Sequence, residues 1–250
     1  MAHRYFIGKD NLFFHTIFWP AMLIGAGHGW RLPDDVVANH YLNLGGEQMS
    51  ASRGHGFLLD DALDALGVDP LRHALCAQNP ESSDTEFRYE QVTEATRTGL
   101  LGAIANPAFR VATLLWRRFG GRADPIAWTE AGRERAEAAQ LLEEAGRAIR
   151  AVELRRALDL VHRLGRTVNQ TLAEVEPWNL PDPEAHRVLT QVLPYLDALG
   201  TAAWPIVPGT AGRTRALLGR PEAPRDWSVE EGAPVVTRAP EPPFRPDPDR

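Results

Sequence analysis

The sequence contains very little lysine and very little cysteine. Lys9 is the only lysine among 27 basic residues, and Cys76 is the only cysteine in a chain of 250 residues. A single cysteine can form neither an internal disulfide nor a two-cysteine zinc knuckle, so we expect a reducing, cytoplasmic setting and no metal site. The formal net charge of −6 excludes a basic field over the whole molecule, although a local basic patch could still bind phosphate.

No long apolar run points to a membrane. Residues 12–26 are apolar, but His15 interrupts them, and a membrane span needs about 20 such residues. The first residues also lack the small-residue cleavage site of a signal peptide. We therefore predict that residues 12–26 belong to a buried helix, and we expect neither a membrane nor DNA as a partner.

The chain opens with the pattern of a small α/β unit. Residues 5–8 predict a strand, Asp10 can cap a helix over residues 11–25, and Pro20 should kink that helix. Residues 36–42 predict a second strand. Strand, helix and strand in this order are the minimum of a parallel α/β sheet.

From Leu58 onward the pattern is helical. Apolar residues recur at spacings of three, four and seven, which is typical of amphipathic helices. The proline-rich and charged tail from Arg220 is expected to extend over the surface. Helices are predicted over residues 59–66, 70–77, 89–119, 129–149, 154–175, 184–203 and 210–218, with starts at Thr129 and at Asp182-Pro183 and a stop at Gly120-Gly121.

Several segments resemble those of methionyl-tRNA synthetases, in the same order and at similar spacing. Any one of them would be a weak signal, but the ordered set runs over almost the whole chain and is specific. The segments are Phe6-Ile7-Gly8-Lys9-Asp10, Phe14-His15, Trp19-Pro20-Ala21, Asn39-His40-Tyr41-Leu42-Asn43-Leu44, Gln48-Met49-Ser50-Ala51-Ser52, Leu71-Arg72-His73-Ala74-Leu75, Asn79-Pro80-Glu81-Ser82-Ser83-Asp84, Asn106 with Arg110, Phe119-Gly120-Gly121, Glu176-Pro177-Trp178-Asn179-Leu180 and Pro240-Glu241-Pro242-Pro243-Phe244.

The resemblance implies a mainly α fold, in which a remnant of a Rossmann-type α/β catalytic domain precedes an anticodon-binding-type α-helical bundle. It divides the chain into a second-half remnant of the class I catalytic domain (1–57), connecting helices like a stem-contact region (58–86), the helical bundle (87–220) and an extended proline-rich tail (221–250). The family's first half, with its His-x-Gly-His element and its zinc-bearing segment, has no counterpart in this sequence.

One segment matches the family's catalytic loop in position but not in charge. Gln48-Met49-Ser50-Ala51-Ser52 stands where the family has Lys-Met-Ser-Lys-Ser, whose lysines hold the ATP phosphates and stabilise charge during adenylate formation. Gln48 and Ala51 are neutral, and Arg53 is the only cation nearby. We interpret the segment as a degenerate loop that now serves as a turn. No cofactor is expected on this chain alone, and ATP would bind only if a partner completed the site.

Gly8, Asp10 and His15 match positions that approach the ATP ribose and the methionine side chain in the family. A glycine lets a ligand approach the backbone, and a carboxylate can accept hydrogen bonds from ribose hydroxyls. Each residue also has a structural explanation: a turn at Gly8, a helix cap at Asp10 and a hydrogen-bonded core histidine at His15. Without the other half of the pocket, the structural explanations are favoured.

Asn106, Arg110 and Trp178 match residues that read a CAU anticodon in the family. Asn106 and Arg110 are four residues apart and so share a helix face, from which they can offer hydrogen bonds to base edges. Trp178 offers a stacking surface at a helix end. Core packing for Trp178 and ordinary surface charge for Arg110 are the alternatives. Pro107 should disturb the helix and could move Asn106.

Two groups of arginines could form a phosphate-binding face. The alternative is a solvated helix surface on which they pair with acidic neighbours, and the sequence does not decide between the two. The arginines are Arg117, Arg118, Arg122, Arg147, Arg150, Arg155, Arg156, Arg163 and Arg166, and the acidic neighbours are Glu143, Glu144, Glu153 and Asp159.

Two functions are compatible with these features. The first is a tRNA-binding module, with a CAU-anticodon tRNA as its expected ligand and no independent aminoacylation. The second is a fragment or subunit of a methionine–tRNA ligase that a separate chain completes, against which the neutral loop argues. In both, half a parallel sheet exposes an edge and an apolar face, which predicts a protein partner or a homodimer through the α/β remnant. A decayed gene would not keep its amphipathic helices, and recruitment to another use of aminoacyl-tRNA is neither supported nor excluded.

Overall fold

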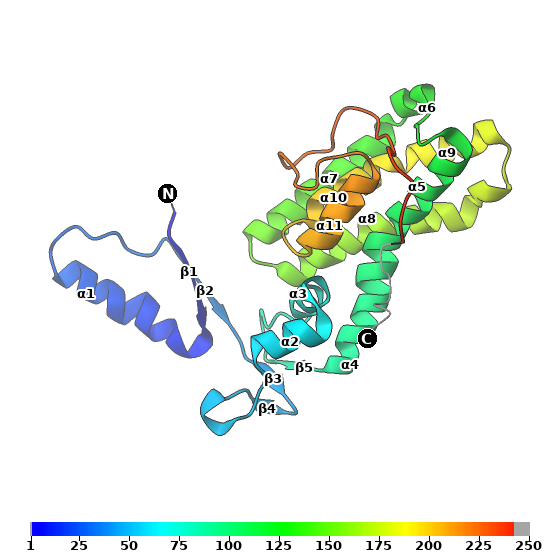
Figure 1. Cartoon of the computed structure of the whole chain (residues 1–250). Helices are drawn as coiled ribbons and strands as arrows, with labels where there is room; N and C mark the ends of the chain where they lie inside the picture. The colour runs from blue at the N-terminus through cyan, green and yellow to red at the C-terminus, as the bar shows by residue number, and fades with distance from the viewer. Residues whose placement is uncertain (1, 243–250) are drawn as a thin grey trace. The chain divides into compact units, whose positions relative to one another are not determined.

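The computed structural model describes residues 2–242, which form two compact units (Figure 1). The first contains the residues up to Leu58 together with Gln78–Tyr89, and the second contains Leu59–Ala77 together with the residues from Glu90 onward. The predicted connecting segment 58–86 is therefore shared between the units. Pro243 and Phe244, which belong to the last motif of the sequence, lie outside the described residues.

The first unit contains the predicted strand–helix–strand arrangement. Strands β1 (Arg4–Gly8) and β2 (Asp35–Asn39) pair in parallel, and an ion pair of 2.7 Å joins Arg4 to Asp35 at the start of the register. The chain between them passes through η1 (Lys9–Asn11), the π-helical η2 (Phe14–Phe18) and α1 (Trp19–Gly25). Pro20 falls in the first turn of α1, and the wider π turns directly before it let the helical run continue past the proline.

Two details of this unit differ from the prediction. Asp10 does not cap the helix, because its carboxylate accepts a hydrogen bond from the Tyr41 hydroxyl. The second strand ends at Asn39, and β3 (Leu42–Leu44) starts another sheet, in which it pairs with β4 (Glu47–Gln48) antiparallel and with β5 (Thr85–Phe87) parallel. Gly45 and Gly46 form the turn between β3 and β4 with φ values of 62° and 82°.

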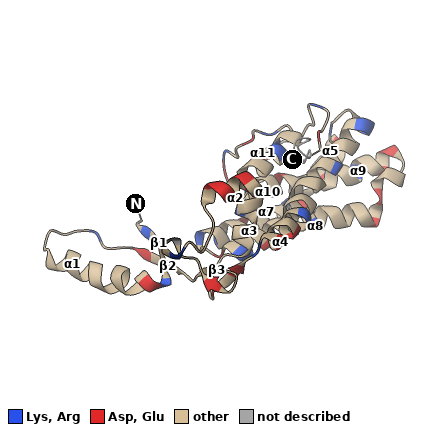
Figure 2. Cartoon of the chain, turned by 60° about the horizontal axis from the view of Figure 1, so that its bottom comes forward, with Lys and Arg blue, Asp and Glu red and all other residues tan. Residues whose placement is uncertain are grey.

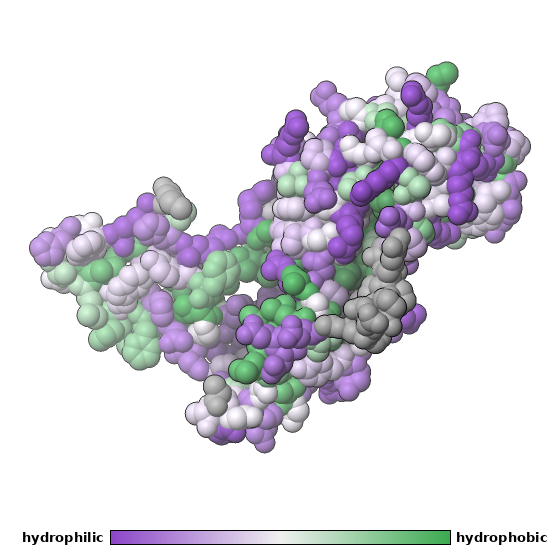
Figure 3. All heavy atoms as spheres, in the orientation of Figure 1, coloured by the Kyte–Doolittle hydropathy of each residue, from purple (hydrophilic) through white to green (hydrophobic). Residues whose placement is uncertain are grey.

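The apolar helix of the first unit is exposed, which contradicts the prediction of a buried helix over residues 12–26. Ile24 is 67% exposed, and the two-stranded sheet is too narrow to cover the helix. Hydrophobic side chains gather over this helix in Figure 3. The exposed apolar residues of the β1–α1–β2 region are Phe6, Leu12, Phe13, Phe14, Ile17, Phe18, Met22, Ile24, Trp30 and Leu32.

The second unit is a helical bundle around a buried central helix, α10 (Leu193–Ala203), all of whose residues are buried. Helices α7 (Gly132–Arg150), α8 (Leu154–Val175) and α11 (Pro208–Leu217) contact it. The predicted apolar stripe of α8, which includes Leu158, Val161, Val168 and Leu172, is buried. The other helical segments are α2 (Leu59–Leu66), α3 (Val68–Ala77), α4 (Tyr89–Ala95), η4 (Thr96–Ala105), α5 (Asn106–Phe119), α6 (Pro125–Glu130), α7 (Gly132–Arg150), α8 (Leu154–Val175), η5 (Pro177–Asn179), α9 (Asp182–Gln191) and α11 (Pro208–Leu217).

One of the two predicted helix starts is wrong, and the other is confirmed. The N-terminus of α6 is capped by Asp124, whose carboxylate accepts from the backbone N–H groups of Ile126 and Ala127, so Thr129 lies inside a helix. Helix α9 starts at Asp182, as predicted, but the Asp182 side chain does not cap it, because its carboxylate binds Arg118 at 2.5 Å. The cap of α6 is a local bond, whereas the partner of Asp182 lies 64 residues away in sequence.

Helix α3 is fixed to the bundle by Asp69 and Arg72. The Asp69 carboxylate accepts from the backbone N–H and the hydroxyl of Thr210 and so caps α11 from another helix. Arg72 donates to the carbonyls of Ile206 and Pro205, at 2.7 and 2.8 Å. These bonds explain why residues 59–77 belong to the second unit.

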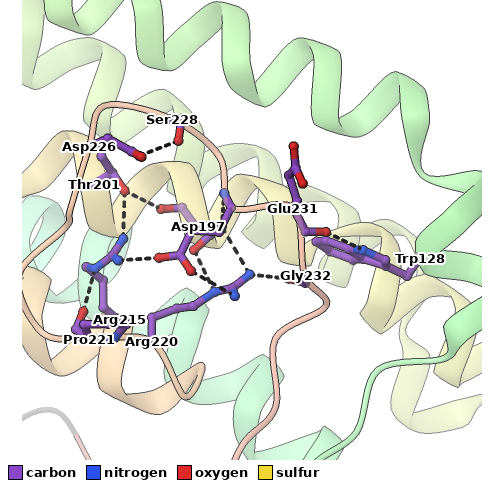
Figure 4. A network of polar contacts seen from close by, with 11 residues as sticks. Trp128, Asp197, Thr201, Arg215, Arg220, Pro221, Asp226, Ser228, Glu231 and Gly232 are labelled. Carbon is purple, nitrogen blue, oxygen red and sulfur yellow. Dashed lines mark hydrogen bonds and ion pairs between the residues drawn. The ribbon is translucent and has the colours of Figure 1, made fainter.

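The segment after Arg220 is extended, as predicted, but its first part is anchored to the core rather than lying over the surface. Arg215, only 1% exposed, donates to the Pro221 carbonyl, the Thr201 hydroxyl and the Glu230 carboxylate. Asp197 is fully buried, and this burial raises the pKa of its carboxyl, against the pull of the Arg220 guanidinium 3.3 Å away (Figure 4). A buried charged network of this kind fixes the path of the segment across the bundle.

The long predicted helix is continuous from Tyr89 to Phe119, but its middle, η4, has π-type turns. It is long and apolar enough to cross a membrane by composition, yet 56% of its most apolar window is buried in the bundle, as in the core helix of a globular domain. Gly120 ends it in the left-handed conformation, as predicted. Pro107 therefore does not break the helix.

Helices α3 and α8 contact the π turns very closely. A Cβ on Gly165 of α8 would overlap the carbonyl oxygen of Ala103, and a Cβ on Gly99 would overlap the His73 ring. His73 is buried and shares a 2.9 Å hydrogen bond, Nε2 to Nε2, with His162 of α8. Burial lowers the pKa of both imidazoles to about 4, because it disfavours the charged ring.

We predict that Gly165→Ala lowers the free energy of unfolding by about 3 kcal/mol or more, since the neighbouring atoms are backbone and cannot move aside. Gly132→Ala is the matched control, because nothing lies within 4 Å of its Cβ position, and it should change the free energy by less than about 1 kcal/mol. Chemical denaturation followed by the helical circular dichroism signal gives both values. Equal stability of the two variants would contradict the close contact.

We also predict an acid-sensitive contribution from the histidine pair. The unfolded imidazoles titrate near pH 6.5 and the folded ones near 4, so the stability is present above pH 6.5 and is lost as the pH falls towards 4. His162→Asn removes one of the two groups and should reduce the loss between pH 7 and 5 by about 1–2 kcal/mol. Denaturation at both pH values measures this. The unchanged protein and His162→Asn have the same carboxylates. If both lose the same free energy of unfolding between pH 7 and 5, the histidine pair makes no acid-sensitive contribution.

Candidate functional site

The segment that matches the catalytic loop folds back on itself. Gln48 ends β4, and Ser50 and His55 exchange backbone hydrogen bonds of 2.6 and 3.0 Å across the loop. Ser50 Oγ lies 3.1 Å from Ser52 Oγ, and the Arg53 guanidinium donates to the Gln48 carbonyl at 3.1 Å. The one cation of the loop is thus engaged with the loop's own backbone. Met49 packs beside Gly56, and Ala51 opens the short helix η3 (Ala51–Arg53).

Asp10 belongs to a polar cluster of the first unit. Asp84 accepts from Lys9 Nζ at 2.7 Å and from the backbone N–H of Tyr41 at 3.0 Å, and Tyr41 in turn donates to Asp10. The hydrogen bond from Lys9 is the main reason that the pKa of Asp84 is lowered. The cluster ties the Gly-Lys-Asp and Asn-His-Tyr motifs of the sequence to the Asn79–Asp84 loop.

Gly8 and His15 lie outside this polar cluster. Gly8 is extended, with φ −76°, and its Cβ position faces open space, so the expected turn is not the reason for a glycine here. His15 is half-buried beside Tyr5 and Trp19, and its Nδ1 donates to the Asn11 carbonyl at 3.0 Å. The histidine is therefore hydrogen-bonded, as the structural explanation requires, although it lies at the edge of the unit.

Arg110 and Trp178, 68 residues apart in sequence, lie together on the surface of the bundle. The Arg110 guanidinium is 5.6 Å from the centroid of the Trp178 ring, and the Trp178 side chain is 43% exposed. Trp178 is therefore not a core residue, and its exposed ring can still stack on a planar ligand. Asn106 begins α5 one turn before Arg110 and is half-buried, and no hydrogen-bond partner of its side chain occurs within residues 2–242.

Arg118, which sequence reasoning placed only in a general basic face, holds the loop that carries Trp178. Its guanidinium donates to the carbonyls of Pro177 and Leu180, at 2.8 and 2.9 Å, and to the Asp182 carboxylate. The loop leaves α8 through Glu176, a non-glycine residue with φ 48°. The contacts of Arg118 offset the strain that this conformation carries and fix the position of the Trp178 backbone.

Asn169 of α8 is a further residue that sequence reasoning missed. Its amide nitrogen donates to the Gly102 carbonyl at 2.9 Å, and its amide oxygen accepts from Arg110 Nη1 at 3.4 Å. It also lines a cavity of about 630 Å³ whose other polar residues are His73, Arg97, Thr98, His162 and Arg166. An amide next to the apolar stripe of α8 was the only signal in the sequence.

Many of the other arginines are engaged with acidic neighbours. Glu143 pairs with Arg147 and Arg150 at 3.9 and 3.2 Å, and all three side chains are largely exposed. Arg156 pairs with Glu153 at 2.8 Å, and Arg166 with Asp159 at 2.7 Å. In the view of Figure 2, basic and acidic residues are both scattered over the helices of the bundle. These arginines therefore behave as a solvated helix surface paired with acidic neighbours, which was the second of the two expectations.

Comparison with known proteins places these features in a family. Residues 1–112 match the model of class I tRNA synthetases of the methionine type. The chain is 37% identical over 236 residues to the methionine–tRNA ligase of Roseiflexus sp. (strain RS-1), which covers 92% of this chain and 40% of that protein. It is 38% identical over 219 residues to the enzyme of Roseiflexus castenholzii, with 86% of this chain and 37% of that protein covered.

A solved structure agrees with the sequence relatives. Mycobacterium tuberculosis methionyl-tRNA synthetase, determined with methionyl-adenylate bound, matches 98% of this chain and 50% of its own with a TM-score of 0.81 and 25% identity. The present chain spans only about two fifths of the length of the curated relatives named above. Over this span, the chain belongs to the methionyl-tRNA synthetase family of class I aminoacyl-tRNA synthetases.

Proposed function

We propose that the helical unit is an anticodon-binding-type bundle that binds tRNA and reads a CAU anticodon at Asn106, Arg110 and Trp178. The observation that carries the proposal is the pairing of the Arg110 guanidinium with the exposed Trp178 ring at 5.6 Å. A base can stack on the indole, while the guanidinium and the Asn106 amide offer hydrogen bonds to its edge. The protein would act in the cytoplasm, where tRNA is used in translation.

The same proposal assigns no independent aminoacylation to this chain. The first unit would be a remnant of a Rossmann-type catalytic domain. Its loop has neutral residues at Gln48 and Ala51, and Arg53 is hydrogen-bonded to the Gln48 carbonyl rather than directed at a ligand. Developing charge on ATP phosphates needs a fixed cation, which this arrangement does not supply. Neither ATP nor a metal is therefore part of the proposed function.

A second candidate is a part of a methionine–tRNA ligase that another chain completes, with ATP bound at the joint site. The exposed apolar residues over α1 favour it, because soluble proteins rarely leave such a patch uncovered. The same patch could instead join two copies of this chain. The neutral loop argues against the ligase, since a completed site would still lack both lysines.

We predict that the purified chain binds a CAU-anticodon tRNA more tightly than the same tRNA with an altered anticodon, and that both affinities fall with salt. Trp178→Ala should weaken binding of the CAU tRNA roughly 10-fold or more, because stacking on an aromatic contributes about 1–3 kcal/mol per base. Filter binding or fluorescence anisotropy at two salt concentrations measures these affinities. Equal binding of both tRNAs by the unchanged protein would refute anticodon reading.

Arg110→Ala should reduce the preference for the CAU anticodon in the same assay. Arg117→Ala is the matched control: it removes an exposed cation from the same helix, seven residues further along. It should weaken binding of both tRNAs by a similar small factor and leave the preference unchanged. A loss of preference in the control as large as in Arg110→Ala would mean that general charge, and not base contact, determines binding.

We further predict that the chain alone shows no methionine-dependent exchange between ATP and pyrophosphate. The loop offers no cation for the phosphates, so the adenylate cannot form at a useful rate. A radioactive exchange assay with a full-length family member as positive control measures this. Exchange above background would overturn the assignment of a binding role alone, because the chain would then form the adenylate without a partner and without the two lysines.

A further inference from the structure

The Asn169 side chain joins two groups that lie on different parts of the long helix. Its Nδ2 donates to the Gly102 carbonyl at 2.9 Å, and its Oδ1 accepts from Arg110 Nη1 at 3.4 Å. The two bonds fix the orientation of the amide, because a flipped amide would place N–H donors against the N–H donors of Arg110 and an oxygen against the Gly102 oxygen. Asn169 therefore presents an acceptor to the guanidinium.

The Gly102 carbonyl is available because of Pro107. In the π turns, the Asn106 N–H donates to the Leu101 carbonyl, five residues earlier. By the same spacing, the next N–H would reach Gly102, but residue 107 is a proline and has none. The Asn169 amide supplies the missing donor from the neighbouring helix. The close approach of Gly165 to Ala103, one turn earlier on α8, brings the amide within reach.

We propose that Asn169 is a positioning residue for anticodon reading, which holds the Arg110 guanidinium beside the Trp178 ring. The inference rests on the proposed function and names a residue that acts through Arg110 rather than on the RNA itself. A contact between an arginine and an indole at an exposed site is weak, so it does not by itself restrict a long side chain to one conformation. The hydrogen bond to Asn169 adds a second fixed point on the same guanidinium.

The alternative role is purely structural, in which the bond to Gly102 joins two helices and the contact with Arg110 has no consequence. Asn169→Ala removes both bonds, whereas Asn169→Asp keeps an acceptor for Arg110 and loses the donor to Gly102. A structural role predicts that both variants destabilise the bundle and affect the Arg110–Trp178 pair alike. A positioning role predicts that the aspartate retains the pair and the alanine loses it.

The contact between Arg110 and the Trp178 indole can be followed in these variants without RNA. In a ¹H–¹⁵N spectrum, its N–H resonance is assigned as the one lost in Trp178→Phe. Asn169→Ala should move this resonance towards its position in Arg110→Ala, and Asn169→Asp should leave it near its original position. Gln170→Ala, the exposed neighbour on α8, is the control and should not move it. An unmoved resonance in Asn169→Ala, or equal movement in the alanine and aspartate variants, would overturn the proposal.

The tRNA assay then tests the consequence for recognition. Asn169→Ala should lower the preference for the CAU anticodon by about 3- to 10-fold, the range expected for one lost hydrogen bond. In an Arg110→Ala background the same change should have no further effect on the preference. A further loss of equal size in that background would overturn the role through Arg110. If the unchanged protein binds no tRNA, the proposed function fails, and the indole spectrum still decides whether Asn169 positions Arg110.

Discussion

The close packing of α8 against the π turns of η4 determines where most of the second unit lies. Gly165 leaves no room for a side chain against the Ala103 carbonyl, and Gly99 leaves none against the histidine pair. With α8 fixed at this distance, its apolar stripe covers α10, which is buried along its whole length. The end of α8 is fixed by the same contact, and so is the start of the loop that carries Trp178. Backbone-to-backbone contact of this kind cannot relax by moving a side chain, so it transmits position over the full helix.

The candidate site depends on a few fixed groups rather than on a strong field. The chain has a net charge of −6, and several arginines of α7 and α8 pair with carboxylates on or next to the same helix. Exposed pairs of this type contribute about 0–1 kcal/mol each to stability, but they reduce the charge available to a phosphate backbone. The proposed recognition of tRNA by this surface would therefore rely on stacking and directed hydrogen bonds. Arg118 and Asn169 matter for this reason, since each fixes one half of the Arg110–Trp178 pair.

Sequence periodicity was enough to find most of the helices and the parallel strand pair, although it joined α9 and α10 into one helix. Trp178 was identified through the family resemblance, and its exposure was left open. Periodicity could not find β5, because a three-residue strand is defined by its partner strand, which lies 43 residues earlier in the sequence. Nor could it find the cap at α11, the network around Asp197 or the roles of Arg118 and Asn169, all of which are bonds between distant segments. The exposed α1 was mispredicted because apolar residues indicate that a face is suited to burial and not that a partner element is present. Of the candidate site, residue types were predictable, while their mutual distances required the fold.

Pro107 illustrates how a local rule and the fold can both hold. A proline inside a helix removes one hydrogen bond and leaves a carbonyl without a donor, which costs about 3 kcal/mol when nothing compensates. Here the turns before it are wide, the proline stands in the first turn of α5, and the Asn169 amide satisfies the Gly102 carbonyl. Asn106 consequently stays one helical turn from Arg110, where the motif requires it. Because the same amide also binds Arg110, the group that compensates for the proline is part of the surface that the proline was expected to disrupt. Stability of the π segment and geometry of the site thus depend on one side chain, which links the fold of this bundle to its proposed function.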